Sequence, residues 1–293
     1  MYTHDPEIQR RWAAATSIAI DAGRLTLKYF RRDDLTVDRK SDATPVTIAD
    51  REAELLMRER IMSEFPDDAI LGEEFGERPG ISGWQWVLDP IDGTKSFIHG
   101  VPLYGTLIGV GRNGIHVHKT TVDENTMKNA PGQTGGMSDY VPVIGVAMIP
   151  AVVPGGECVT AALSGGAWVL RDGEPPKRPR VSDVSQVSEA CLATSEFRWF
   201  ARKGINATRD RLESATRLAM SWGDAFGYVQ VALGRAEVMV DVGMNLWDVA
   251  AIPPIIHESG GRFTDWTGSP GITTTAVATN GPLHDEILRL LRK

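Results

Sequence analysis

The stretch WVLDPIDGTKSF, residues 86–97, ends an apolar run with two carboxylates, Asp89 and Asp92, that only Pro90 and Ile91 separate. The run WVL is typical of a buried strand. Two carboxylates this close repel one another unless one is protonated or a cation lies between them. Because oxygen ligands favour a hard ion such as Mg²⁺, which is typically shared with a substrate phosphate, the pair predicts a metal site at the end of a strand.

The residues after the pair predict an anion site at the same turn. Gly93 allows close approach of the backbone, and TKSF, residues 94–97, is expected to open a helix whose free N–H groups bind phosphate. An ordinary exposed turn is the alternative, since Asp, Pro and Gly are turn residues. An EF-hand loop is excluded, because Pro90 and Ile91 stand where oxygen ligands are needed. A phosphatase with an aspartyl nucleophile two residues before Asp92 is excluded too, because Pro90 is there.

Composition bounds the class of protein. The chain has 293 residues, 42% hydrophobic and 24% charged, which favours two packed halves of one enzyme-sized protein. No apolar run approaches the roughly 18 residues of a membrane span. The net charge of -7 argues against a nucleic-acid partner. The N-terminus lacks the pattern of a secretory signal, so we expect a cytoplasmic protein. Cys158 and Cys191 are interpreted as buried reduced thiols.

The first half predicts helices followed by strands. Asp5-Pro6 marks the start of a long helix whose inward face contains Ile8, Trp12, Ala15, Ala19, Ala22 and Tyr29. A second helix is predicted over about 50–64, with Thr47 as its cap and Asp50 three residues on. AILG, WVL, GTLIGV, VIGVAMI and AWVL are predicted strands. Residues 112–141 have no period and are predicted to form a long surface loop or hairpin excursion.

The second half alternates strands and helices. The predicted strands are CLATS, RLAM, EVMV, RFT and AVAT, and the predicted helices lie near 206–216, 225–234, from 247 and 282–292. We expect an α/β protein with a domain boundary near Val181. Residues 1–181 would form an α+β domain with the metal and phosphate site. Residues 182–293 would form an α/β domain that contributes Asp248 and substrate recognition.

Further acids complete a known pattern. Glu73 and Glu74 follow a predicted strand in AILGEEFGE, and Asp248 opens a predicted helix in MNLWDVAAI. Together with residues 89–94, they make the chain resemble the inositol monophosphatase superfamily of Mg²⁺-dependent, lithium-sensitive phosphomonoesterases. The resemblance covers most of the chain apart from 112–141. It implies the layered αβαβα sandwich shared with fructose-1,6-bisphosphatases, and a homodimer.

The resemblance also implies the roles of individual residues. Its metal ligands map onto four acids and one backbone carbonyl: Glu73, Asp89, Ile91, Asp92 and Asp248. Glu73, Asp89 and the carbonyl of Ile91 would hold a first Mg²⁺, while Asp89, Asp92 and Asp248 would hold a second. Glu73 would also place a third ion through water. Asp50 and Thr94 would orient and activate the attacking water, and the backbone N–H groups of Gly93 and Thr94 would bind phosphate. The alternative for Asp50 is that it only caps its helix or forms a salt bridge on it.

Two segments, residues 89–109 and 221–248, resemble the histidinol-phosphatase branch of the superfamily. The residues implied to bind substrate are Asp92, Asp224, Ala225, Asp241 and Asp248. A carboxylate pair formed by Asp224 and Asp241 would suit the cationic amine or imidazole of histidinol phosphate. However, Asp241 also stands where inositol-specific relatives have a hydroxyl-binding Glu, and Asp224 has the alternative of capping the helix near Ala225.

Other residues receive simpler interpretations. Leu246 replaces a proline of the histidinol-phosphatase pattern, and Pro253-Pro254 predicts a kinked helix. The histidines His99, His116 and His118 are interpreted as structural or solvent-facing. Trp84 and Trp86 are expected in the core.

Histidinol phosphate is therefore the expected substrate, and myo-inositol 1-phosphate is the alternative. Fructose 1,6-bisphosphate and 3'-nucleotides rank below them. A silent, metal-binding regulatory relative is a hypothesis of another class. The intact set of Asp50, Glu73, Asp89, Asp92, Thr94 and Asp248 argues against it.

Overall fold

The computed structural model describes residues 5–32, 34, 36–39, 45–113 and 140–292. The strands of the first half are β1 (Val37–Arg39), β2 (Pro45–Thr47), β3 (Ala69–Gly72), β4 (Gly76–Arg78), β5 (Trp84–Asp92), β6 (Gly105–Asn113), β7 (Tyr140–Ile149), β8 (Glu157–Ala162) and β9 (Gly166–Arg171). Those of the second half are β10 (Cys191–Ala193), β11 (Leu218–Met220), β12 (Val238–Val242), β13 (Arg262–Thr264) and β14 (Thr275–Thr279). They form a two-stranded sheet β1-β2, a seven-stranded sheet β4-β3-β5-β6-β7-β8-β9 and a five-stranded sheet β11-β10-β12-β14-β13.

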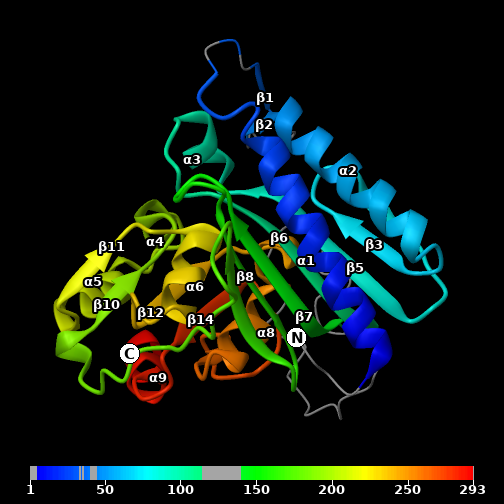
Figure 1. The fold of residues 1–293 in the computed structure, drawn as a ribbon. Helices are drawn as coiled ribbons and strands as arrows, with labels where there is room; N and C mark the ends of the chain where they lie inside the picture. The colour runs from blue at the N-terminus through cyan, green and yellow to red at the C-terminus, as the bar shows by residue number, and fades with distance from the viewer. Residues whose placement is uncertain (1–4, 33, 35, 40–44, 114–139, 293) are drawn as a thin grey trace.

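Helices fill the space around and between the two larger sheets. They are α1 (Pro6–Thr26), α2 (Ile48–Glu64), α3 (Thr94–Ile98), α4 (Phe197–Arg202), α5 (Asn206–Ala215), α6 (Asp224–Ala232), α7 (Leu246–Val249), α8 (Ile252–Glu258) and α9 (His284–Arg292), with a short 3-10 helix at Val187–Glu189. Figure 1 shows α1 and α2 side by side across the seven-stranded sheet. Among the helices described, none combines the length and the hydropathy that a membrane crossing requires.

Three apolar clusters define the layers. One packs α1 and α2 on the outer face of the seven-stranded sheet. The largest lies between the two sheets and contains the buried faces of α6 and α8. The third joins the far face of the five-stranded sheet to α5 and α9. This order of layers confirms the predicted αβαβα sandwich (Figure 1).

The central cluster bears on the predicted domain boundary. The strands divide between the two sheets on either side of Val181, yet α6 and α8 of the second half pack on β6, β7 and β8 of the first. The two halves therefore share one core, and the boundary near Val181 stays a prediction.

α1 begins where the sequence predicts and ends earlier. The side chain of Asp5 accepts hydrogen bonds from the N–H groups of Glu7 and Ile8, and Pro6 occupies the first turn. The helix ends at Thr26, so the inclusion of Tyr29 in its inward face was wrong. The hydroxyl of Thr26 bonds to the carbonyl of Gly23 at 2.7 Å, a local bond that competes with further helical pairing.

β5 carries an irregularity that decides the site. Its pairing with β6 shifts between Asp89, opposite Leu107, and Asp92, opposite Gly105. In a regular strand, residues three apart point to opposite faces, so one extra residue is needed to turn both carboxylates to the same side. Thr106 holds this bulge, because its hydroxyl donates to the carbonyl of Pro90 at 2.8 Å.

Several predicted elements need correction. The helix expected from residue 247 is two helices, α7 and α8, with Pro253 and Pro254 near the start of α8, where a missing N–H costs no intrahelical bond. β6 and β7 pair as far as Asn113 and Tyr140, so the excursion expected over 112–141 overlaps both strands. Its remaining residues, 114–139, lie outside the described part of the chain, as do His116 and His118.

The simpler predictions are confirmed. Cys158 and Cys191 are buried free thiols, and Trp84 and Trp86 belong to the core. His99 is exposed and bonds through Nδ1 to the carbonyl of Lys95 at 2.7 Å.

Candidate metal and phosphate site

An acidic cavity of about 210 Å³ lies where the end of β5 meets residues of the second half. Six carboxylates line it: Glu73, Asp89, Asp92, Asp224, Asp241 and Asp248. The two sheets therefore bring together acids that are far apart in the sequence, as the sequence predicts for Asp89, Asp92 and Asp248.

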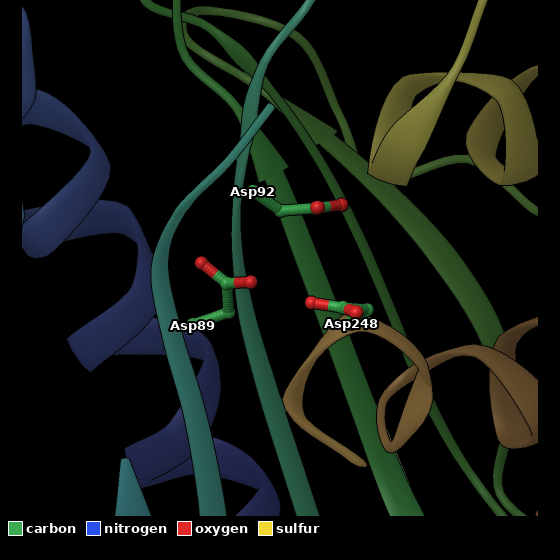
Figure 2. A group of neighbouring side chains, drawn as sticks. All are labelled: Asp89, Asp92 and Asp248. Atoms are coloured by element: carbon green, nitrogen blue, oxygen red, sulfur yellow. The ribbon is translucent and has the colours of Figure 1, made fainter. Parts of the chain in front are cut away.

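Three of these acids converge on one point. Asp89 and Asp92 come from β5 and Asp248 from α7, and Figure 2 shows their side chains directed into a common space. One oxygen from each lies within 4.8 Å of the others. This spacing lets a single ion touch all three groups, and carboxylate oxygens are ligands that Mg²⁺ prefers.

Local structure leaves each of the three acids an oxygen to offer. Oδ2 of Asp92 accepts a short hydrogen bond from the N–H of Ala225. Oδ2 of Asp248 accepts one from the N–H of Asn245 at 2.7 Å, within the capping box of α7. Oδ1 of Asp89 is buried and has no hydrogen-bond partner. An unpaired buried acceptor is costly, so this orphaned oxygen fits the role of a cation ligand.

Burial and mutual repulsion raise the pKa values of the cluster. Burial is the largest cause at each residue. The charge of Glu73 is the next cause for the raised pKa of Asp89, and the charge of Asp224 for that of Asp92. The pKa of Asp248 rises to about 8. A divalent ion between these groups would restore their ionised forms at neutral pH.

Glu73 and Ile91 lie where a second group of ligands is expected. Glu73 follows β3 and lines the cavity beside Asp89. The side chain of Ile91 is buried, and its carbonyl accepts a hydrogen bond from Oγ1 of Thr94 at 3.0 Å. A carbonyl has two lone pairs, so this bond leaves one for a cation.

Gly93 and Thr94 form the expected turn at the cavity. Gly93 caps α3 with φ 89°, a left-handed conformation that favours glycine. A Cβ at Gly93 would also lie 3.0 Å from Oδ2 of Asp224. Glycine therefore lets the turn pass close beside that carboxylate.

Asp50 and Thr94 do not hydrogen-bond to each other in this structure. Oδ2 of Asp50 accepts bonds of 2.7 Å from both the N–H and the hydroxyl of Thr47, which completes a capping box on α2. Oδ1 of Asp50 is buried and unpartnered, and burial raises its pKa to about 7, with contributions from the charges of Glu74 and Glu73. Asp50 is thus the N3 member of the capping box that Thr47 begins, and its Oδ1 has no hydrogen-bond partner.

Asp224 and Asp241 differ in backbone conformation and in hydrogen bonding. Asp224 has φ 57°, a strained conformation that Asp and Asn tolerate better than most residues. The alternative that Asp224 caps the helix is wrong, because α6 begins at Asp224 and has no side-chain cap. Asp241 accepts from the N–H of Ser195 at 3.2 Å, its hydroxyl at 2.8 Å and the hydroxyl of Tyr228 at 3.2 Å. Both oxygens of Asp241 are thus engaged.

The cavity also contains residues that the sequence did not single out: Lys95, Ser195, Trp199 and Tyr228. Ser195 follows β10, a strand parallel to β12, and the carboxyl ends of parallel strands commonly bind ligands. That rule could have found Ser195. Trp199 lies on α4, a helix that no sequence signal predicted, so nothing pointed to it.

The metal-free protein should lose stability as the pH rises from about 4 to about 8. The folded-state pKa values of Asp50 and Asp241 are about 7 and that of Asp248 about 8, all above the ordinary aspartate value of 3.8. The folded state therefore binds more protons than the unfolded state across this window, which makes stability fall with pH. Thermal unfolding in EDTA should show a Tm that decreases from pH 5 to pH 8. A Tm that rises across this window would contradict the assigned environments.

The chain is similar to known proteins in both sequence and fold. The model of the inositol monophosphatase family matches residues 7–118 and 135–293. A histidinol-phosphatase of Chlorobaculum parvum is 40% identical over 258 residues, which cover 88% of this chain and 86% of that protein. A histidinol-phosphatase of Mycobacterium tuberculosis is 35% identical over 278 residues, covering 94% and 96%. The structure of an inositol monophosphatase from Zymomonas mobilis aligns with a TM-score of 0.76 and 27% identity, covering 99% of this chain and 100% of that one.

Proposed function

Because the chain belongs to the inositol monophosphatase family, we propose that it is a Mg²⁺-dependent phosphatase that hydrolyses histidinol phosphate by direct attack of water. The observation that carries the proposal is the convergence of Asp89, Asp92 and Asp248 within 4.8 Å, in a cavity that also contains the Gly93 turn. Such a site combines what a phosphomonoester needs, namely cations for the phosphate charge and a backbone turn for its oxygens.

The carboxylates and the carbonyl at this site support the following ion positions. Glu73, Asp89 and the carbonyl of Ile91 would hold one Mg²⁺, and Asp89, Asp92 and Asp248 would hold another. Glu73 would help to place a third, more weakly bound ion through water. When bound, these ions supply positive charge to the phosphoryl oxygens and lower the pKa of an attacking water.

The chain's own groups would complete the reaction. The N–H groups of Gly93 and Thr94 would bind the phosphate oxygens at the start of α3. Asp50, with its pKa of about 7 and its unpartnered Oδ1, would accept a proton from the attacking water near neutral pH. Thr94 would orient that water. Its hydroxyl donates to Ile91 in this structure, so it would have to turn toward Asp50 when substrate binds.

Substrate choice would depend on the far end of the cavity. Asp224, together with Asp92 and Asp248 and the backbone at Ala225, would face the organic part of the substrate. A cationic amine suits this acidic surface, and the 40% identity to a histidinol-phosphatase favours histidinol phosphate. Asp241 would position Ser195, because its oxygens are already engaged. The Ser195 hydroxyl and the likeness to the inositol monophosphatase of Zymomonas mobilis favour myo-inositol 1-phosphate as the alternative.

A phosphate-release assay tests the proposal. Protein treated with EDTA should release no phosphate from histidinol phosphate, and added Mg²⁺ should restore turnover. Absence of turnover on either phosphomonoester with Mg²⁺ present would favour a silent, metal-binding relative. Inhibition by Li⁺, a homodimer and a cytoplasmic location remain predictions that accompany the proposal.

A further inference from the structure

Glu54 lies one helical turn after Asp50 on α2 and is fully buried. Its carboxylate does not reach the cavity. Oε2 accepts a hydrogen bond from the N–H of Glu74 at 2.7 Å, and Oε1 accepts one from the N–H of Phe75 at 3.2 Å. A buried carboxylate thus binds the backbone immediately after Glu73.

Arg58, on the next turn of α2, completes the arrangement. Its Nε donates to Oε1 of Glu54 at 2.7 Å, and its Nη2 donates to the carbonyl of Gly76. The two side chains therefore hold both ends of the segment 74–76 through one ion pair. Removing one member of a buried ion pair leaves the other without a partner, which is costly. An ion pair with this many backbone partners therefore fixes the conformation of the segment that it binds.

Gly72 shows how closely the carboxylate approaches this segment. A Cβ at Gly72 would lie 2.0 Å from Oε1 of Glu54, a distance that no real contact reaches. Glu73 therefore follows a glycine that leaves room for the Glu54 carboxylate, and it precedes the two residues whose N–H groups donate to that carboxylate. β3 ends at Gly72, and the N–H of Glu73 still donates to the carbonyl of Leu88 in β5 at 3.2 Å. The backbone of Glu73 is therefore held by the sheet on one side and, through the next residue, Glu74, by Glu54 of α2 on the other.

We propose that Glu54 and Arg58 are positioning residues for the metal site, which hold Glu73 at a fixed place relative to Asp50. The inference rests on the proposed function, because it takes Glu73 as a metal ligand. α2 then carries both the proton acceptor and the support of a ligand on one rigid helix. The charges of Glu74 and Glu73 also contribute to the raised pKa of Asp50.

Metal titration of the Glu54→Gln protein tests this role. Glutamine keeps the shape, but its NH₂ group would face a backbone N–H and would leave Arg58 without its carboxylate. Calorimetric titration of EDTA-treated protein with Mn²⁺ should show about tenfold or greater loss of affinity relative to the wild type, because groups that support metal ligands typically contribute 10–100-fold. An unchanged affinity would overturn the inference.

A matched control separates positioning from stability. Glu258 also accepts two backbone bonds in a turn, from Ser164 at 2.8 Å and Gly166 at 2.7 Å, and it does not line the cavity. Glu258→Gln should lower the Tm and leave Mn²⁺ affinity unchanged. Equal losses of affinity in the Glu54 and Glu258 variants would contradict positioning.

Two further outcomes are decisive. If the Glu54→Gln protein does not fold, the Arg58→Lys protein is titrated instead. Lysine keeps the positive charge but loses the hydrogen bond to the carbonyl of Gly76. The Mn²⁺ affinity of this variant should fall about threefold or more, and wild-type affinity would overturn the inference. Wild-type protein that binds no Mn²⁺ would instead refute the proposed function, so the two failures are distinguishable.

Discussion

Asp92→Asn should lower kcat by about a thousandfold or more and leave the fold intact. Asp92 is one of three acids that share an ion position, and neutralising it removes ligand charge from the site. Loss of about 4 kcal/mol of transition-state stabilisation corresponds to this factor. The amide oxygen of asparagine can still accept the bond from Ala225, so the contact between β5 and α6 is kept.

The same substitution should stabilise the protein when no metal is present. Burial and neighbouring charges raise the pKa of Asp92, which means that its ionised form is unfavourable in the fold. In EDTA at pH 8, Asp92→Asn should therefore have a higher Tm than the wild type, and Mg²⁺ should raise it less. Asp183→Asn, at an exposed position outside the cavity, is the control and should change neither rate nor Tm. A wild-type kcat in Asp92→Asn would remove Asp92 from the metal site.

The fold was predictable where a pattern was long and regular. α2 and α9 differ from their predicted bounds by about two residues, because each has an apolar face along a whole helix. β8 was not predicted, because all six of its residues are buried and ECVTAA shows no alternation. α4 has six residues, too few to show a helical period.

The site was predictable in its acids and not in its geometry. Asp89 and Asp92 signal a cation through their repulsion alone, whereas Asp248 gained its role only from the family resemblance. Nothing in the sequence shows the bulge that turns Asp89 and Asp92 to one side, since it depends on pairing with β6. Likewise, the engagement of Asp241 by Ser195 and Tyr228 depends on how β10, β12 and α6 pack together.

Asp224 offers the sharpest distinction between the two proposed substrates. It lines the cavity next to Gly93, and burial raises its pKa while the charge of Lys95 lowers it. An ammonium group on the substrate would lower the pKa of Asp224 further, as Lys95 does, and so favour its ionised form. Because an unpaired buried charge costs about 2 kcal/mol or more, loss of this carboxylate should penalise a cationic substrate and spare a neutral polyol.

Asp224→Asn should therefore lower kcat/KM for histidinol phosphate by about 30-fold and that for myo-inositol 1-phosphate by less than about threefold. Asparagine suits the test because it also tolerates the left-handed backbone at this position. Asp241→Asn is the informative comparison: its oxygens hold Ser195 and Tyr228, so its loss should impair both substrates alike. Steady-state kinetics with both phosphomonoesters measures the ratio. If Asp224→Asn lowers kcat/KM equally for the two substrates, this carboxylate does not recognise the amine. Histidinol phosphate would then no longer be favoured over myo-inositol 1-phosphate on this ground.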